Sequence, residues 1–313
     1  MARAFVFPGQ GSQVVGMGRE LCDAFQAARL VYEEVDEALG QRLSRVILDG
    51  PESELSLTEN AQPALMATSL AVVRVLEDEA GLRLAEAGCF VAGHSLGEYS
   101  ALAAAGALSL ADTARLLRQR GRAMQQAVPV GEGAMAAVLG LELDKVRCLA
   151  GAAANGAVCA LASDNAPGQV VVSGAASAID RLIELAPARG ARRAVRLQVS
   201  APFHCALLAP AAAEMAAALD SIAIAAPAPA LVANVTAEAV VEPARIRALL
   251  VEQMTAMVRW RESVLYMKDH DVDTLVELGA GKVLANLARR IDPELAGVAV
   301  LTPHDVEALA RSL

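Results

Sequence analysis

The segment that decides how the rest of the chain is interpreted is Cys89-Phe90-Val91-Ala92-Gly93-His94-Ser95-Leu96-Gly97-Glu98-Tyr99-Ser100. A short apolar run, typical of a buried strand, leads into Gly93–Gly97, and an alanine-rich helical pattern follows to about Ala105. This is the G-x-S-x-G nucleophile elbow in its strand–turn–helix context. Glycines on both sides lack a β-carbon, so strand and helix can close around a strained serine. We predict Ser95 as the nucleophile; a serine in an ordinary glycine-flanked turn is the alternative.

The N-terminal segment offers a second glycine-rich loop. Arg3–Phe7 reads as a first strand that ends at Pro8-Gly9-Gln10-Gly11-Ser12-Gln13. The loop suggests a dinucleotide site, but Val14 stands where the third glycine of that fingerprint would be, so the pattern is not met. We expect this loop to bring backbone close to a substrate atom instead.

Composition excludes several classes of function. The chain has 313 residues and a net charge of −9, which argues against nucleic acid as a partner. No apolar run reaches the roughly 18 residues that a membrane span needs. The five cysteines are scattered, without Cys-x-x-Cys spacing, so we expect free thiols, no metal site and a cytoplasmic location.

The order of predicted elements indicates an α/β fold with an insertion. Residues 130–198 read as β-α-β-β-α-β, the ferredoxin-like unit, with a turn at Asp164–Gly168 and a capping box from Ser177 to Asp180. Strands and helices alternate elsewhere, which favours a doubly wound parallel sheet, and we expect this sheet to be α/β-hydrolase-like. We predict a large catalytic domain of residues 1–129 and 199–313 and an inserted small domain of residues 130–198. The ligand cleft is expected at the carboxyl ends of the parallel strands, roofed by the insertion.

A nucleophilic serine needs a base, and the chain contains four histidines. His94 adjoins the serine and is aimed elsewhere by the backbone, His270 falls in a polar run, and His304 opens the last helix. His204, in Ser200-Ala201-Pro202-Phe203-His204, is the remaining candidate, with an ordinary buried histidine as the alternative. No free acid lies between positions 95 and 204, because Asp112 and Asp180 are read as helix caps and Asp164 as a turn residue. We therefore predict a Ser–His dyad whose histidine is oriented by a neutral acceptor.

Several segments together resemble the malonyl-CoA:acyl carrier protein transacylase family, in the right order and nearly from end to end: Phe7–Gln13, Asn60–Leu65, Gly93–Ser100, Asn165–Gln169 and Pro202–Cys205. The resemblance implies Ser95 as acyl nucleophile and His204 as base. It also implies an oxyanion hole from the backbone N–H groups of Gln10 and Leu96, and the carbonyl of Gln253 as the group that orients the histidine. One departure is Ala280 in Gly279–Lys282, where the family usually has proline.

The resemblance further implies how the substrate is chosen. Arg120, in Arg118-Gln119-Arg120-Gly121-Arg122, resembles the arginine that grips the malonyl carboxylate, a role that suits a bidentate guanidinium. A solvated helix arginine is the alternative. Phe203 resembles the bulky residue of malonyl-selective domains that excludes an α-methyl branch.

The expected activity is that of an acyltransferase with two half-reactions. It moves malonyl from malonyl-CoA to Ser95 and then to the phosphopantetheine thiol of acyl carrier protein, for fatty-acid biosynthesis. Coenzyme A thioester and phosphopantetheine are substrates, and no tightly bound cofactor or metal is expected. A monomer is expected, with the acidic carrier docking on Arg189, Arg192, Arg193 and Arg196 or on Lys282, Arg289 and Arg290. Three alternatives remain: an acyl hydrolase on the same fold, a non-catalytic acyl-binding subunit, and a malonyltransferase that serves a polyketide synthase or malonate decarboxylase complex.

Overall fold

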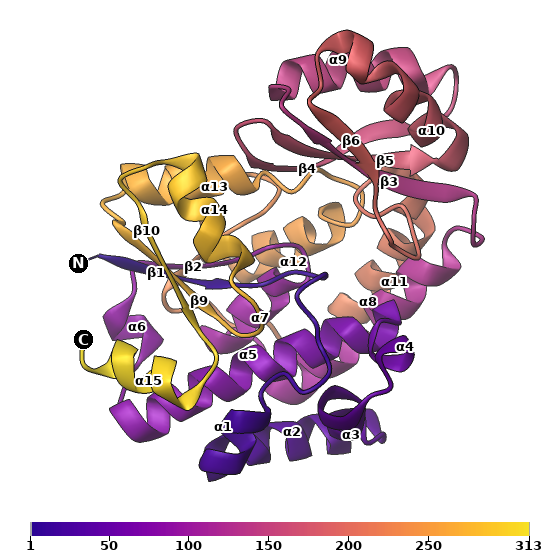
Figure 1. The fold of residues 1–313 in the computed structure, drawn as a ribbon. Helices are drawn as coiled ribbons and strands as arrows, with labels where there is room; N and C mark the ends of the chain where they lie inside the picture. Colours follow the sequence, from indigo (N-terminus) through magenta and orange to yellow (C-terminus); the bar gives the residue numbers. More distant parts are fainter. Residues whose placement is uncertain (1, 313) are drawn as a thin grey trace.

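The computed structural model describes residues 2–312, which form two sheets with helices around them (Figure 1). The larger sheet has six strands in the order β10-β9-β1-β2-β7-β8, parallel except for the last pair. Its strands are β1 (Arg3–Phe7), β2 (Phe90–Gly93), β7 (Ala230–Val232), β8 (Ala239–Val240), β9 (Thr274–Leu278) and β10 (Ala296–Val300). This is the parallel α/β sheet that the sequence predicts.

The central strand β1 shows why the sheet needs helices on both faces. Ala4 and Val6 pack into a core beneath α13 (Trp260–Asp269) and α14 (Val283–Ile291), whereas Phe5 and Phe7 join the core on the opposite face. All four side chains are fully buried. A parallel strand covered on both faces reads as a continuous apolar run, which is the pattern found here.

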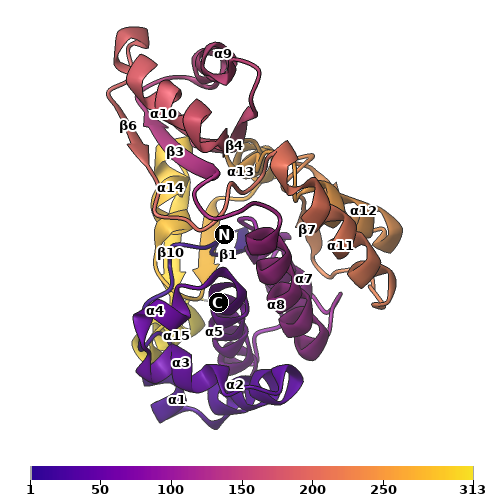
Figure 2. The same ribbon diagram turned by 90° about the vertical axis from the view of Figure 1, so that its right-hand side faces the viewer.

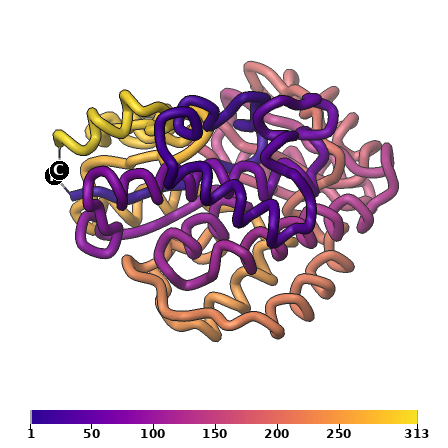
Figure 3. Tube along the Cα trace, turned by 90° about the horizontal axis from the view of Figure 1, so that it is seen from below, coloured from indigo at the N-terminus to yellow at the C-terminus, as the bar shows by residue number. Residues whose placement is uncertain are grey.

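Helices of the N-terminal half cover the second face. The long helix α5 (Thr58–Ala80) packs against α2 (Gln26–Leu39) and α8 (Leu110–Gln126), and these N-terminal segments form the lower side of the molecule (Figure 3). Around them lie α1 (Arg19–Ala24), α3 (Leu43–Asp49), α4 (Glu52–Leu55), α6 (Leu84–Ala87), α7 (Gly97–Ala104) and α15 (Pro303–Ala310). On the far side of α8, α11 (Ala209–Asp220) packs against α12 (Pro243–Glu252), as Figure 2 shows.

The smaller sheet is antiparallel and has the order β4-β5-β3-β6. Its elements run β3 (Gly133–Leu139), α9 (Leu143–Ala154), β4 (Cys159–Ala166), β5 (Gln169–Ala175), α10 (Ala176–Leu185) and β6 (Arg193–Arg196). Short 3-10 turns follow α10 (Pro187–Arg189) and precede α11 (Ala206–Leu208). This order is the ferredoxin-like arrangement expected for this part of the chain. Since the sheet starts at Gly133 and ends at Arg196, we propose domain boundaries close to residues 130 and 198.

Two local predictions for the small sheet are wrong. The predicted turn Asp164–Gly168 is shorter, because β4 continues to Ala166 and its register shifts twice against β5. The predicted capping box at Ser177 does not form, since α10 starts one residue earlier and has no side-chain cap. Asp180 instead pairs with Arg196, with an oxygen–nitrogen distance of 2.5 Å.

The extended β4 strand ties the small sheet to the large one. The buried Asp164 pairs with Arg261 of α13 at 2.9 Å, and backbone hydrogen bonds join Ala162 and Asp164 to Val258. The small sheet is thus fixed next to the carboxyl ends of the parallel strands, where Ser95 lies (Figure 1).

Of the helices in residues 2–312, none combines the length and the apolar character that crossing a membrane would require.

Candidate active site

Ser95 lies at the sharp turn between β2 and α7, in a left-handed backbone conformation with φ of 55°. The turn is possible only because its flanking residues are glycines. A β-carbon on Gly93 would lie 1.9 Å from the carbonyl carbon of Gly97, and one on Gly97 would lie 2.2 Å from the carbonyl oxygen of Phe7. A non-glycine residue in this conformation is strained, and such strain is typical of functional sites.

Asn234 holds this strained turn from both sides. The residue follows β7 and is fully buried. Its Oδ1 accepts a hydrogen bond from the Ser95 N–H at 2.8 Å, and its Nδ2 donates to the Gly93 carbonyl at 2.7 Å. One side chain therefore satisfies two buried backbone groups that the bend leaves without partners in the sheet or the helix.

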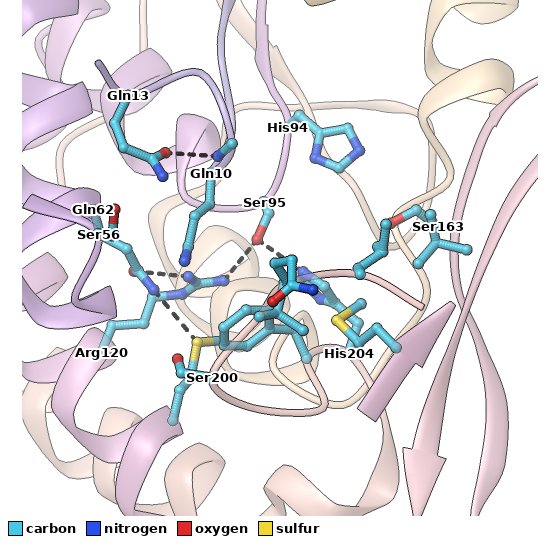
Figure 4. Close-up of a pocket in the computed structure, with 18 of the residues that line it drawn as sticks. Gln10, Gln13, Ser56, Gln62, His94, Ser95, Arg120, Ser163, Ser200 and His204 are labelled. Carbon is cyan, nitrogen blue, oxygen red and sulfur yellow. Dashed lines mark hydrogen bonds between the residues drawn. The ribbon is translucent and has the colours of Figure 1, made fainter. Parts of the chain in front are cut away.

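The structure brings Ser95 together with His204. The Ser95 Oγ lies 2.8 Å from His204 Nε2, and Figure 4 shows the two side chains pointing toward one another. The other ring nitrogen, Nδ1, lies 2.9 Å from the backbone carbonyl oxygen of Gln253, which follows the last residue of α12. A carbonyl can only accept, so Nδ1 carries the proton and Nε2 is free to accept the proton of the serine hydroxyl.

His204 is arranged to remain neutral. Its side chain is buried, and burial together with the nearby charge of Arg120 lowers the pKa of the imidazole to about 3. An imidazole without a positive charge at neutral pH is ready to act as a base. His204 also has a left-handed backbone, with φ of 60°, so both members of the pair are held in strained conformations.

Arg120 reaches the same oxygen from the opposite side (Figure 4). Its Nη2 donates to the Ser95 Oγ at 3.1 Å and to the Gln253 Oε1 at 2.7 Å, and its Nη1 donates to the Gln62 Oε1 at 2.8 Å. The guanidinium also lies 5.6 Å from the centre of the Tyr99 ring. Arg120 is 1% exposed, yet within residues 2–312 it forms no ion pair with a carboxylate. A buried cation gains free energy from a charged partner, so Arg120 is a candidate binding group for an anion.

The pocket in front of these residues has a volume of about 310 Å³ and lies between the two sheets. Large-domain residues form one wall, including Ser95, His204, Arg120 and Phe203. The small sheet supplies the facing wall, with Met135 from β3, Ser163 and Asn165 from β4 and Val171 from β5. The largely buried Phe203 directly precedes His204 in the chain and lines the same pocket.

Two backbone N–H groups beside Ser95 are free to donate. Among the described residues, neither the Gln10 N–H nor the Leu96 N–H has an acceptor within the protein. Leu96 precedes the first residue of α7, so its N–H belongs to the positive end of that helix. Gln10 lies in the loop after β1, in the lining of the pocket, and its side chain lies 3.4 Å from the Thr58 hydroxyl.

The other histidines lie away from the reacting atoms. His94 points away from the Ser95 hydroxyl (Figure 4). Its Nε2 lies 2.9 Å from the Oδ1 of Asn165 in the small sheet. His270 ends α13 and its Nδ1 contacts the Tyr266 carbonyl oxygen, while His304 lies in the first turn of α15. Asp164, paired with Arg261, does not serve as a third triad member.

Sequence reasoning missed three residues that support the site. Gln62 falls in the Asn60–Leu65 segment, which carried part of the resemblance, but its contact with Arg120 was not foreseen. Asn234 and Glu98 were not singled out, although both are polar residues beside apolar runs. A polar side chain in such a position is a detectable signal, because burial requires it to have a hydrogen-bond partner.

Comparison with known proteins agrees with this geometry. The model of the acyl transferase domain family matches residues 4–298, which is most of the chain. The chain belongs to the acyl transferase domain family. The matched residues include Ser95, Arg120 and His204.

Relatives of this acyl transferase domain extend over its full length. It is 43% identical over 311 residues to the malonyl CoA-acyl carrier protein transacylase of Bacillus subtilis, covering 99% of this chain and 96% of the relative. It is 42% identical over 305 residues to the protein of the same name from Escherichia coli K12, covering 97% of both chains.

Solved structures give the same result. An acyl-carrier-protein S-malonyltransferase from Bartonella henselae superposes with a TM-score of 0.97 at 52% identity, covering 100% of this chain and 99% of the other. A malonyl-transacylase solved in complex with its type II PKS acyl-carrier protein has a TM-score of 0.97 at 38% identity, with both chains fully covered.

Proposed function

We propose that this protein is an acyl-carrier-protein S-malonyltransferase of fatty-acid biosynthesis. It transfers malonyl from malonyl-CoA to the phosphopantetheine thiol of acyl carrier protein through a malonyl ester on Ser95. One observation carries the proposal: the Ser95 Oγ lies between a neutral imidazole at 2.8 Å and a buried guanidinium at 3.1 Å that pairs with no carboxylate of the described residues. The first group suits acyl transfer, and the second suits an acyl group that ends in a carboxylate.

The first half-reaction loads the serine. His204 Nε2 takes the hydroxyl proton while the Ser95 Oγ attacks the thioester carbonyl carbon of malonyl-CoA. The carbonyl oxygen becomes negative and is stabilised by the N–H groups of Gln10 and Leu96. The Gln253 carbonyl accepts from Nδ1 and steadies the imidazolium. As the carbon–sulfur bond breaks, His204 returns its proton to the departing thiolate of coenzyme A.

The second half-reaction reverses these roles for a new thiol. The phosphopantetheine thiol gives its proton to His204 and its sulfur attacks the malonyl ester carbon. The same two N–H groups stabilise the oxyanion. The bond to the Ser95 Oγ then breaks, the hydroxyl regains the proton from His204, and malonyl leaves on the carrier. Coenzyme A and phosphopantetheine act as substrates, and no step requires a bound cofactor.

Arg120 selects the acyl group in this proposal. Its guanidinium forms two hydrogen bonds with the free carboxylate of malonyl, while Gln62 and Gln253 hold the arginine in place. An acetyl group leaves the buried cation without a carboxylate, so malonyl is favoured. Phe203 narrows the pocket beside the reacting carbonyl and disfavours an α-methyl branch.

The carrier protein approaches, in our proposal, along the Lys282 side of the pocket. Lys282, Arg289 and Arg290 are exposed on or beside α14, and the neighbouring residues Val283, Leu284 and Leu287 line a cavity of about 270 Å³ that shares Gln10 and His94 with the site. The arginines at the end of the small domain are less free, since Arg196 is paired with Asp180. An acidic carrier protein complements a basic surface.

We also propose that the protein acts as a monomer in the cytoplasm. The site uses residues of a single chain, which supports action as a monomer. The five free cysteines fit the reducing conditions of the cytoplasm.

Radiolabelled malonyl-CoA tests the proposal directly. Incubation of the full chain without carrier protein is expected to leave one stable label, which is absent in Ser95→Ala and is transferred when holo-acyl carrier protein is added. Release of the label as free malonate before carrier is added would indicate a hydrolase. A chain that acquires no covalent label would indicate a binding subunit.

A further inference from the structure

Glu98 is a buried acid that the proposed mechanism does not use. It lies in the first turn of α7, three residues after Ser95, and is 1% exposed. Its Oε2 accepts a hydrogen bond from the Gln253 Nε2 at 2.5 Å, and the Asn234 backbone N–H lies 3.4 Å away. It forms no ion pair with another described residue, so its strongest contact is with the Gln253 side chain.

The Gln253 side chain links Glu98 to Arg120. Its Oε1 accepts from the Arg120 Nη2 at 2.7 Å, and its Nε2 donates both to Glu98 and to the Ser95 carbonyl at 3.1 Å. An amide has an accepting end and a donating end, and both are used here according to their polarity. Were the amide rotated by half a turn, its NH₂ group would meet the guanidinium, and two donors would face each other.

Glu98 determines which of these two orientations is stable. The Oε2 of Glu98 accepts from the Gln253 NH₂ group, so the end of the amide that faces Glu98 is the donating end. The accepting end of the same amide then faces Arg120. Burial of all three residues strengthens this preference, because each unmatched polar contact inside the protein costs free energy.

We propose that Glu98 is a positioning residue that, through the Gln253 amide, aims the Arg120 guanidinium at the substrate carboxylate. This inference rests on the proposed malonyltransferase function, in which Arg120 binds malonyl. Glu98 touches neither the substrate nor the reacting atoms in this account. Its contribution is seen in the choice between acyl groups, whereas a residue that merely fills space would affect all acyl groups equally.

The test compares malonyl-CoA and acetyl-CoA as donors. The kcat/KM for acylation of Ser95 is measured with each donor for the full chain and for Glu98→Leu, which keeps the bulk but cannot accept a hydrogen bond. We expect the malonyl-to-acetyl ratio to fall by roughly tenfold or more, in line with the loss of one hydrogen bond to a charged group. In Glu98→Gln, whose own Oε1 can still accept from Gln253, the ratio should remain within about threefold of the original.

A double-mutant comparison shows whether Glu98 acts through Arg120. In an Arg120→Ala background, Glu98→Leu should leave the malonyl-to-acetyl ratio unchanged, because the group it positions is gone. A further fall of the ratio in that background would overturn the proposal. So would an equal loss for both donors in Glu98→Leu itself, since that is the behaviour of a residue with a structural role only.

Failure to fold is covered by a second variant. If Glu98→Leu is unfolded at the assay temperature, Glu98→Asp is used instead. This variant shortens the side chain by one methylene, which moves the acceptor away from Gln253, and it should still lower the malonyl-to-acetyl ratio. An unchanged ratio in a folded Glu98→Asp chain would then overturn the proposal. Failure of the underlying function looks different: the unaltered chain would not form a malonyl ester, or Arg120→Ala would keep full discrimination.

Discussion

Arg120 and Ser95 share a hydrogen bond of 3.1 Å, with the guanidinium Nη2 donating to the hydroxyl oxygen. A cation at this distance is placed to reach a group carried by the acyl chain on that same oxygen. In the proposed function, this short separation ties the choice of acyl group to the position of the nucleophile, and the first prediction follows from it.

Arg120→Ala should abolish most malonyl transfer while keeping or raising acetyl transfer. Loss of the carboxylate partner removes the preference for malonyl, so the malonyl-to-acetyl ratio of kcat/KM should fall by about a hundredfold or more. Arg122→Ala is the matched control, because this arginine lies on the same helix but is exposed and pairs with Glu59 at 2.5 Å. An equal loss of kcat/KM for both donors in Arg120→Ala would contradict binding of the malonyl carboxylate by Arg120.

The rate of Ser95 acylation should not decrease as the pH is lowered through 6.5, where a histidine with an ordinary pKa becomes protonated. Burial lowers the pKa of His204 to about 3, so the imidazole remains unprotonated, and therefore active as a base, as pH decreases from 8 to 5. The burst rate of Ser95 acylation measures this. It is best followed in Glu98→Gln, because burial raises the pKa of the Glu98 carboxyl to about 7 and its titration would overlap. A half-maximal rate near pH 6.5 in that variant would contradict the assignment.

Asn234→Ala should impair both stability and turnover. The substitution leaves the Ser95 N–H and the Gly93 carbonyl without their buried partner, which should lower the free energy of unfolding by about 1–3 kcal/mol. Denaturant titration measures that change. The rates of both half-reactions, loading of Ser95 from malonyl-CoA and transfer to the carrier, should also decrease because the serine is no longer fixed. Asn286→Ala, at an exposed position on α14, is the control. Unchanged stability would show that the two hydrogen bonds are not needed to hold the turn.

Backbone strain at the nucleophile can be measured with two inactive variants. Ser95→Gly and Ser95→Ala both lose the hydroxyl, but only glycine adopts the left-handed conformation without a β-carbon penalty of about 1 kcal/mol. We therefore expect Ser95→Gly to be the more stable of the two in denaturant unfolding. The reverse order would mean that the conformation at φ of 55° carries no strain.

Charge reversal should locate the docking surface for the carrier. Lys282→Glu with Arg289→Glu is expected to raise the KM for acyl carrier protein and to leave the KM for malonyl-CoA unchanged, and the effect should diminish at high salt. Arg192→Glu with Arg193→Glu, at the end of the small domain, is the matched comparison. If only the second pair raises the KM for the carrier, then the carrier docks on the small domain.

The parts of the molecule that the sequence predicted are those with local signals. The elbow combines two glycines, an apolar run and a helix start within a dozen residues, and the order of elements in residues 130–198 is specific to one sheet arrangement. His204 could be reached because only four histidines compete. The hydrogen bonds of the Gln253 side chain could not be predicted, because they form only where α7, α8 and α12 meet in space. The sequence at the end of a helix does not indicate which distant residues it contacts.

The same reasoning explains the local errors. Ser177 and Asp180 have the spacing of a capping box, yet α10 starts one residue early and Asp180 finds Arg196 on β6. A partner on a distant strand leaves no trace in the local sequence pattern, so the spacing alone cannot reveal it. The local pattern likewise predicts Asp164 in a turn, because its partner Arg261 lies almost a hundred residues further along the chain.

The crowding around Gly93 and Gly97 has a consequence for redesign of this protein. Neither position tolerates even a methyl group, so the half of the pocket that holds the nucleophile is closed to variation. The opposite half is built from Met135 and Val171 on a separate sheet. Acceptance of bulkier extender units can therefore be engineered on one side of the cavity while the reacting oxygen stays where it is.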